Sequence, residues 1–169
     1  PPGFKVIVSS ATINAAVFSE YFDECPVVKI DAITYPVEVI HDPTEIEGDY
    51  DQLLQKIEDI VDATAKKGGP GDILIFLPGE KAIKDCSARI QALPGSRDFE
   101  ILPLYARLAA EEQERVFAEF PGKRKVIVAT NIAETSVTID GVRTVIDPGV
   151  AKLSFYNQRT FTSSLIEVP

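Results

Sequence analysis

The chain has 169 residues, of which 45% are hydrophobic and 25% charged, with 12 prolines and 10 glycines. This is the composition of one globular domain, and it argues against a disordered chain. No apolar run approaches the roughly 20 residues of a transmembrane helix, and the net charge of −9 argues against a large nucleic-acid-binding face.

The first half of the chain carries the patterns of three short strands and two helices. The strands are predicted at residues 4–9, 27–30 and 37–40, and the helices at residues 14–22 and 50–67. Asp49 is placed to cap the second helix, and Gly68-Gly69-Pro70-Gly71 is expected to end it.

The second half alternates strands with helices. Strands are predicted at residues 72–77, 99–103, 125–129 and 142–147, and helices from Gly79 to about Leu93 and at 109–120. The run D-I-L-I-F-L at 72–77 is typical of a central parallel strand that is covered on both faces. The alternation predicts an α/β fold with a parallel sheet, and residues 151–168 read as a C-terminal β-hairpin around 157–160.

The charge is unevenly distributed along the chain. Residues 1–120 hold 11 Lys and Arg against 22 Asp and Glu, a net −11, whereas residues 121–160 hold six against three, a net +3. Glu167 supplies the last charge, and −11 + 3 − 1 gives −9. A basic stretch in an acidic chain indicates an anionic partner there, although a set of merely solvated basic side chains accounts for the charge equally well.

Two cysteines, Cys25 and Cys86, lie far apart, and His41 is the only histidine. Neither cysteine has a CxxC partner, which argues against a zinc site. Cys86 falls on the apolar face of a predicted helix and reads as a core thiol, so the pair suits a reduced, cytosolic compartment. The chain begins Pro1-Pro2-Gly3 without an initiator Met or a signal peptide, and we expect it to be an excised fragment.

Four loops are expected at the carboxyl ends of the parallel strands, where ligands bind in such sheets. They are Ser9–Thr12, Pro78–Glu80, Leu104–Leu108 and Ala129–Gly141. Small residues and backbone amides at these loops suit a phosphate, although each loop alone is a weak signal. No G-x-x-x-x-G-K-[ST] and no G-x-G-x-x-G occurs. A domain without its own triphosphate cradle often completes the site of a partner domain.

Longer stretches are more specific than any single loop. The most specific is T-N-I-A-E-T-S-V-T-I-D-G at 130–141, followed by V-I-D-P-G at 145–149. The others are S-A-T at 10–12, Y-P-V-E-V at 35–39, I-L-I-F-L-P-G-E at 73–80 and L-P-L-Y-A-R-L at 102–108, with E-Q and V-F after it. Through them almost the whole chain resembles the second RecA-like domain of DEAH-box ATP-dependent RNA helicases, most closely the bacterial HrpA type.

The resemblance implies a RecA-like sheet with helices on both faces, the P-loop NTPase architecture without its own Walker A motif. Residues 1–24 would be the tail of the first RecA-like domain, and residues 25–169 the second domain, ending before the family's arginine-finger motif Q-R-x-G-R-x-G-R. Ala32 and Ile33 stand where the family usually has Gly-Arg, which puts any contact of that Arg in doubt.

The resemblance also assigns roles to residues. It implies RNA binding by Gly79, Thr130 and Asn131, nucleotide binding by Phe117, Thr138 and Asp140, and coupling of the two sites by Ser10, Ala11, Thr12, Thr135 and Ser136. It implies no catalytic residue and no metal ligand in this stretch. From the residues alone, Phe117 reads instead as a helix-face core residue and Gly79 equally well as a plain helix-start glycine.

The function implied is that of one wall of an interdomain ATP site and part of a single-stranded RNA path. ATP with Mg would be bound mainly by the first RecA-like domain, so the fragment alone is predicted to be inactive. Implied partners are RNA, the other domains of the same chain, and ribosomes or ribonucleoproteins, in the cytoplasm and without a membrane. Two alternatives stay open, a non-enzymatic protein-docking module and a DNA-directed helicase.

Overall fold

The computed structural model describes residues 3, 5–8, 14–29, 35–42, 50–131, 133 and 138–149, and the backbone of residues 151–157 and 162–168. By its contacts the chain divides into two compact units, residues 1–44 and residues 45–169. The predicted division after residue 24 rests on the resemblance and stays a prediction.

The first unit holds one short helix. Helix α1 spans Ala15–Tyr21, and the side chain of Asn14 accepts a hydrogen bond from the Ala16 amide at 3.2 Å, which confirms the predicted helix and its start. The Ser19 hydroxyl donates to the Cys25 carbonyl at 2.9 Å and so ties the chain beyond the helix back to it.

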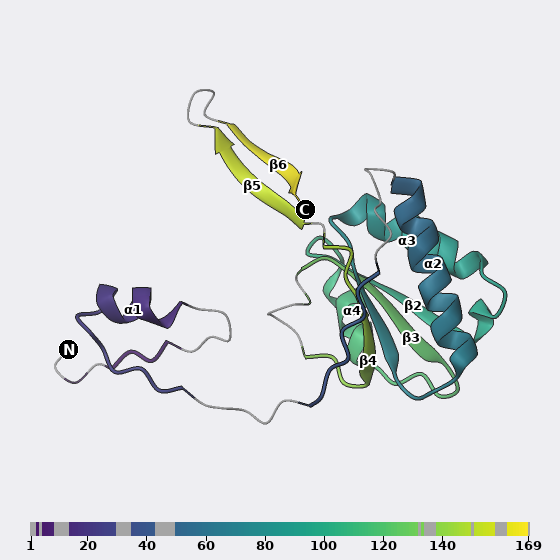
Figure 1. The fold of residues 1–169 in the computed structure, drawn as a ribbon, viewed down its shortest axis with the longest axis horizontal. Coiled ribbons are helices and arrows are strands. Elements are labelled where there is room, and N and C mark those ends of the chain that lie inside the picture. Colours follow the sequence, from purple (N-terminus) through teal and green to yellow (C-terminus); the bar gives the residue numbers. More distant parts are fainter. Residues whose placement is uncertain are drawn as a thin grey trace. The chain divides into compact units, whose positions relative to one another are not determined.

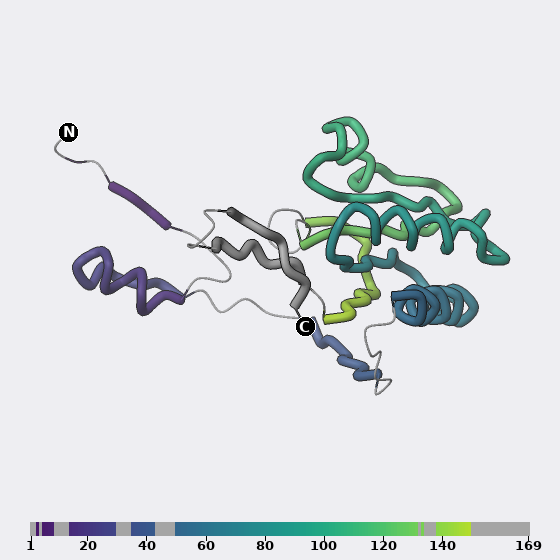
Figure 2. Tube along the Cα trace, turned by 90° about the horizontal axis from the view of Figure 1, so that it is seen from above, coloured from purple at the N-terminus to yellow at the C-terminus, as the bar shows by residue number. Residues whose placement is uncertain are grey.

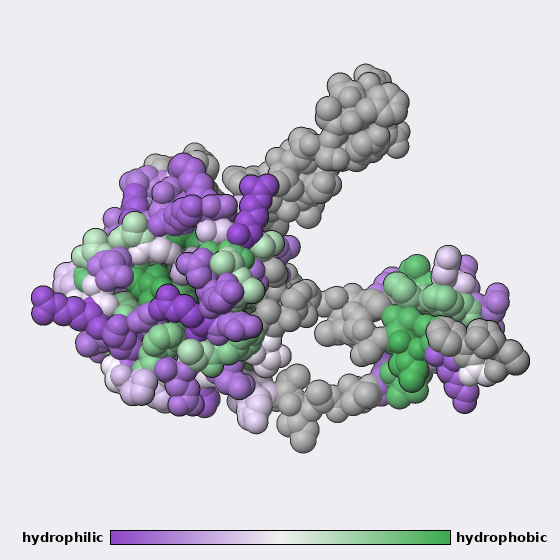
Figure 3. Space-filling model, turned by 180° about the vertical axis from the view of Figure 1, so that it is seen from behind, coloured by the Kyte–Doolittle hydropathy of each residue, from purple (hydrophilic) through white to green (hydrophobic). Residues whose placement is uncertain are grey.

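The three strands predicted in this unit are wrong for the residues that the structure describes. Residues 5–8, 27–29 and 37–40 are irregular, and their side chains are exposed, with Ile7 at 91% and Val28 at 82%. Apolar β-branched residues form a strand only when a neighbouring strand pairs with them, and the described part of this unit provides none. Figure 3 shows apolar side chains gathered on the surface of this unit.

The second unit is built on a parallel four-stranded sheet (Figure 1). Its strands are β1 (Asp72–Phe76), β2 (Phe99–Leu104), β3 (Arg124–Ala129) and β4 (Val142–Ile146), in the order β2-β3-β1-β4. Strand β1 pairs with β3 from Ile73–Val126 to Phe76–Ala129. The central position predicted for the D-I-L-I-F-L run is therefore confirmed, because β1 has a parallel neighbour on each side.

Helices cover both faces of this sheet, as predicted. On one face lie α2 (Tyr50–Lys67) and α3 (Glu80–Ala92), and Figure 2 shows α2 nearly end-on beside the strands. Their buried side chains pack on Ile73, Ile75, Val126 and Val128 of the sheet, and they are Leu54, Ile57, Val61, Ala82, Ile83, Cys86 and Ile90. Cys86 is fully buried and is the core thiol that its helical position indicated.

The other face is covered by a shorter segment. Helix α4 (Ala110–Glu114) is followed by a 3₁₀ turn, η2 (Arg115–Phe117), so the helix predicted to reach Phe120 ends early. Ala118 is extended, and Pro121 disfavours helical geometry at the residue before it. The η2 turn directs Val116 into a core with Leu102 and Ile127.

A second 3₁₀ turn and a hairpin complete the description. The turn η1 (Ser96–Asp98) leads into β2. Strand β5 (Ala151–Asn157) pairs antiparallel with β6 (Thr162–Val168), which confirms the predicted hairpin. No helix within the described residues is long and apolar enough to cross a membrane.

Candidate functional site

The loops at the carboxyl edge of the sheet bring three of the predicted residues to one end. The Leu77 amide donates to the Ala129 carbonyl at 2.8 Å, and the Thr130 amide donates to the Leu104 carbonyl at 3.0 Å. These backbone bonds extend the ladders beyond the strands. The turn to Gly79 and the start of the segment at Thr130 and Asn131 therefore leave the sheet side by side.

Gly79 has a backbone that suits glycine. Its φ of 138° lies in a region that L side chains rarely adopt, and it directly precedes α3. No side chain caps the first amides of α3. At the same edge Thr130 is half-buried and Asn131 is exposed. The arrangement offers uncapped amides and small polar side chains, which are groups that bind a phosphate without reading a base.

Positive charge accompanies this edge. Lys84 donates to Glu80 at 2.6 Å, and this hydrogen bond is the main reason that the pKa of the Glu80 carboxyl lies below its ordinary value. The charge of Arg107, on the loop after β2, lowers the same pKa further. Lys84 and Arg107 are both exposed, and because Glu80 balances the charge of Lys84, the three side chains together carry a net charge of about +1 in a chain that is acidic as a whole.

The segment after β3 does not stay at the carboxyl edge. The Asp72 amide donates to the Gly141 carbonyl at 2.8 Å, which places Gly141 beside the first residue of β1. The expectation that the whole loop Ala129–Gly141 lies at the carboxyl edge is therefore wrong for its end. Consecutive parallel strands require a connection that returns to the start of the next strand, and five strand residues span about 16 Å.

Phe117 lies at this opposite, amino edge as well. The Val116 carbonyl accepts a hydrogen bond at 3.0 Å from Nζ of Lys125, the second residue of β3. Val116 is fully buried, whereas Phe117 is 56% exposed. The interpretation of Phe117 as a core residue is thus wrong in this structure. Thr138 and Asp140 are exposed too, and Asp140 directly precedes Gly141.

A buried ion pair connects the elements at the amino edge. Nζ of Lys125 lies 3.4 Å from Oδ2 of Asp72, with side-chain exposures of 10% and 15%. Oδ1 of Asp72 accepts the Lys125 amide at 2.9 Å. Neither Lys125 nor Asp72 is among the site residues that the sequence predicted. The available signal was a charged residue directly before each apolar run, Asp72 before residues 73–77 and Lys125 before residues 126–129.

Five of the residues predicted to couple the two sites lie outside the described part of the chain, as do the two departures from the family pattern. The first group is Ser10, Ala11, Thr12, Thr135 and Ser136, and the second is Ala32 and Ile33. Among the residues that the structure does describe, no group of three or more His, Cys, Asp or Glu side chains is placed to hold a metal ion.

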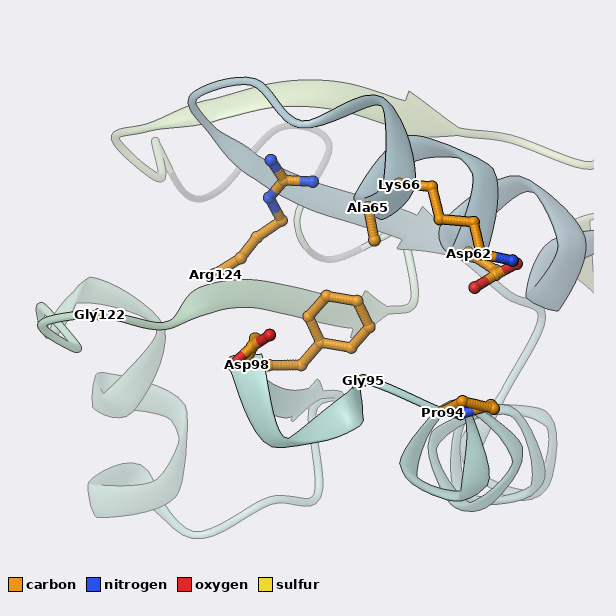
Figure 4. Close-up of a pocket in the computed structure, with 9 residues that line it drawn as sticks. Asp62, Ala65, Lys66, Pro94, Gly95, Asp98, Gly122 and Arg124 are labelled. Carbon is orange, nitrogen blue, oxygen red and sulfur yellow. The ribbon is translucent and has the colours of Figure 1, made fainter.

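A pocket of about 390 Å³ opens beside the start of β3, on the α2 side of the sheet (Figure 4). It is lined by Asp62, Ala65, Lys66, Pro94, Gly95, Asp98, Phe99, Gly122 and Arg124, and none of these is a predicted site residue. Arg124 extends toward the end of α2, where it donates to the carbonyls of Thr64, at 3.3 Å, and Gly69. It caps a helix C-terminus, so its guanidinium is already occupied.

Comparison with known proteins identifies the domain. The family model described as the helicase conserved C-terminal domain matches residues 52–160. The chain belongs to this helicase C-terminal domain family. The match begins in α2 and ends beyond β5, so it includes both edges of the sheet.

Similar helicases contain this domain as a small part of their length. The chain is 48% identical over 98% of its length to the ATP-dependent RNA helicase HrpA of Borreliella burgdorferi, and covers 20% of that protein. It is 46% identical over 94% of its length to the HrpA of Escherichia coli, covering 12% of it. It is 42% identical over 99% of its length to the pre-mRNA-splicing factor ATP-dependent RNA helicase prp22 of Schizosaccharomyces pombe, covering 15%. The chain thus spans a fifth or less of these relatives.

A solved structure supports the fold of the helicase C-terminal domain. The crystal structure of the E. coli DExH-box NTPase HrpB is similar, with a TM-score of 0.73 and 30% identity, over 94% of this chain and 19% of that one. Together with the helicase relatives, this similarity confirms the resemblance to DEAH-box helicases and the RecA-like fold expected from the motifs.

Proposed function

We propose that the chain is the second RecA-like domain of a longer ATP-dependent RNA helicase of the DEAH-box class. In this proposal residues 1–24 are the tail of the first RecA-like domain and residues 25–169 form the second. The domain supplies one wall of the interdomain ATP site and part of the single-stranded RNA path, and it couples ATP hydrolysis to RNA unwinding or translocation. The names of the similar proteins support it.

The observation that carries this proposal is the separation of two sets of residues to opposite edges of one sheet. Gly79, Thr130 and Asn131 belong to the carboxyl edge, whereas Phe117 and Asp140 belong to the amino edge. A helicase must bind RNA and nucleotide on distinct surfaces of the same rigid body, so that a movement caused at one is transmitted to the other.

At the carboxyl edge, amides and small polar side chains hold the RNA backbone. Such contacts carry little sequence preference and tolerate an acidic domain, because the groups that touch phosphate are dipoles and a few local cations such as Lys84 and Arg107. Gly79 offers its backbone to the RNA strand, and its φ of 138° is one that residues with a Cβ rarely adopt.

At the amino edge, the exposed ring of Phe117 stacks on the nucleotide base and Asp140 accepts from the ribose hydroxyls, with Thr138 beside them. An exposed aromatic ring and an exposed carboxylate fit these two parts of a nucleotide. Mg²⁺, held mainly by the first RecA-like domain, supplies charge neutralisation at the phosphates. Ser10, Ala11, Thr12, Thr135 and Ser136 couple the two sites.

The partners in this proposal are RNA, the first RecA-like domain and the C-terminal domains of the same protein, with ribosomes or ribonucleoproteins as larger assemblies. A cytoplasmic location agrees with the two free cysteines, Cys25 and Cys86.

The proposal is tested first by turnover. The isolated 169-residue chain should show no ATPase activity, because its sequence lacks the G-x-x-x-x-G-K-[ST] loop that cradles a triphosphate. The longer protein should hydrolyse ATP, and faster with RNA. ATP hydrolysis by the pure 169-residue chain would contradict the proposal that the triphosphate is bound mainly by the first RecA-like domain. A longer protein without any ATPase activity would favour the protein-docking module instead.

The RNA side is tested by Thr130→Ala in the longer protein. Loss of the hydroxyl should weaken the RNA-stimulated ATPase more than the basal ATPase, because Thr130 lies at the edge assigned to RNA. Equal loss of both activities would remove the case for an RNA contact. Competition between RNA and DNA strands of one sequence would separate an RNA helicase from a DNA-directed one.

A further inference from the structure

We propose that Lys125 and Asp72 are positioning residues for the nucleotide, and that their buried ion pair sets both Phe117 and Asp140. The inference rests on the proposed function, in which these two exposed residues meet the base and the ribose. The side chains of Lys125 and Asp72 are only 10% and 15% exposed, so they lie largely beneath the surface that carries Phe117 and Asp140.

Lys125 acts on Phe117 through the peptide group between residues 116 and 117. Its Nζ donates to the Val116 carbonyl at 3.0 Å, and that carbonyl shares one planar peptide with the Phe117 amide. The Val116 side chain is anchored in the core, with no exposed surface. An anchored side chain and a bonded carbonyl together fix the direction in which the next residue leaves the turn, so the ring of Phe117 is held outward.

Asp72 acts on Asp140 through Gly141. The Asp72 amide donates to the Gly141 carbonyl at 2.8 Å, and a Cβ on Gly141 would lie 2.9 Å from Oδ2 of Asp72. The carboxylate therefore packs directly on the glycine backbone, whose φ is +90°. Residue 140 directly precedes Gly141, so its position depends on the backbone bond from Asp72 and on the carboxylate that lies beside the glycine.

The ion pair joins these two contacts into one unit. The amide of Lys125 donates to Oδ1 of Asp72 at 2.9 Å, while its ammonium lies 3.4 Å from Oδ2. An apolar pair of similar volume would satisfy the sheet equally well, as Ile73 and Val126 do one step further along. An apolar pair could not hydrogen-bond to the Val116 carbonyl, whereas Lys125 does and so orients that peptide group. A pair with a structural role alone would not need this bond.

The chain offers a matched control in Lys123. It lies two residues before Lys125 and pairs with Glu100 at 2.9 Å, together with Arg115 at 2.6 Å. No hydrogen bond or ion pair of Lys123 with Val116 or Asp72 is found in the described part of the chain. Lys123→Ala therefore removes a neighbouring lysine without touching the proposed positioning unit.

The experiment is a double-mutant cycle in the longer helicase, with KM for ATP, kcat and the RNA concentration for half-maximal stimulation as readouts. Phe117→Ala should raise KM about tenfold, the loss expected for one stacked base. Lys125→Met should raise KM about threefold to tenfold, with kcat and RNA half-saturation within about twofold of wild type. Lys125→Arg should restore part of the effect, and Lys123→Ala should change nothing beyond about twofold.

The double variant decides between positioning and general destabilisation. If Lys125 acts through Phe117, Phe117→Ala with Lys125→Met should have a KM well below the product of the two single effects. A multiplicative effect, or an unchanged KM in Lys125→Met, overturns the inference. An unchanged KM in Phe117→Ala instead overturns the nucleotide role in the proposed function.

A second variant covers the case in which Lys125→Met does not fold. Should Lys125→Met fail to fold at the assay temperature, Asp72→Asn carries the test, because the amide keeps an acceptor for the Lys125 backbone while the charge is removed. It should raise KM for ATP at least threefold; a KM equal to that of wild type overturns the inference.

Discussion

The two edges of the sheet are held in different ways. At the carboxyl edge, Gly79 and Thr130 are placed by backbone hydrogen bonds that continue the strand ladders. At the amino edge, a backbone bond from the Asp72 amide holds Gly141, and a buried pair of charged side chains, Lys125 and Asp72, is added to it. The first device depends on the fold alone, while the second depends on two particular residues.

The difference indicates what each edge tolerates. Ladder bonds form with almost any side chain, so substitutions of exposed side chains at the carboxyl edge, such as Asn131, should affect ligand binding and leave folding alone. A buried charge without its partner is costly, so substitutions inside the amino edge should affect both. The predictions below test this contrast.

The largest effect is expected from Lys125→Met in the 169-residue chain. It leaves the Asp72 carboxylate buried and the Val116 carbonyl without its donor, and should lower the free energy of unfolding by about 3–5 kcal/mol. Lys123→Ala should cost at most about 1 kcal/mol, because that lysine is exposed. Urea unfolding measures both, and equal losses would contradict the contrast.

The reactivity of Cys86 is an independent measure of the stability lost in Lys125→Met. Burial raises the pKa of its thiol to about 12, so the native side chain is shielded and protonated at pH 8. Its labelling by a thiol reagent then requires opening of the core. Labelling should be faster in Lys125→Met than in Lys123→Ala, and the same rate in both would show that the buried pair adds no stability.

The next effect is expected from Gly141→Ala, with Gly122→Ala as its control. Both glycines have positive φ, +90° and +77°, but only the Cβ at residue 141 meets another group, Oδ2 of Asp72 at 2.9 Å. Gly122→Ala should cost about 1–2 kcal/mol for the backbone alone, and Gly141→Ala about 3 kcal/mol. Urea unfolding measures both variants. Equal destabilisation of Gly122→Ala and Gly141→Ala would argue against close packing of Asp72 on Gly141.

At the carboxyl edge, Asn131→Ala should leave the free energy of unfolding within about 0.5 kcal/mol of wild type, because the side chain is exposed. In the longer protein the same change should raise the RNA concentration for half-maximal ATPase stimulation about tenfold, the value of one hydrogen bond to a charged group. A stability loss like that of Lys125→Met would erase the difference between the edges.

The smallest effect is expected from Lys84→Ala. The hydrogen bond from Lys84 lowers the pKa of Glu80 below its ordinary 4.5, so this carboxylate stabilises the fold above that pH and the contribution disappears as the pH falls through the lowered pKa. The urea midpoints of wild type and Lys84→Ala should differ slightly at pH 7, and the difference should shrink as the pH falls through the lowered pKa of Glu80. A difference between the midpoints that grows on acidification would contradict a stabilising contribution from the ionised Glu80 carboxylate.

Much of the second unit was predictable from sequence, because its strands β1 and β3 are covered on both faces and carry continuous apolar runs. The same apolar signal failed at residues 5–8, 27–29 and 37–40. Sequence reports the capacity to pair, while a strand also needs a partner beside it. The end of the helix predicted at 109–120 failed because the chain turns early to bury Val116.

The roles predicted for the site residues stay predictions, but their arrangement differs from what the sequence indicated. The motif at 130–141 predicts Thr130, Asn131 and Asp140 at one edge, yet its two ends lie at opposite edges, since a crossover must return to the start of the next strand. The pairing of Lys125 with Asp72 joins residues 53 positions apart. No local pattern specifies such a contact.

The most direct measurement compares Phe117→Ala with Thr130→Ala in one steady-state ATPase assay of the longer protein, with ATP and RNA varied independently. If the edges have separate roles, Phe117→Ala raises KM for ATP about tenfold and leaves RNA half-saturation within about twofold, while Thr130→Ala does the reverse. If both variants shift both constants to the same extent, the assignment of nucleotide to one edge and RNA to the other is wrong.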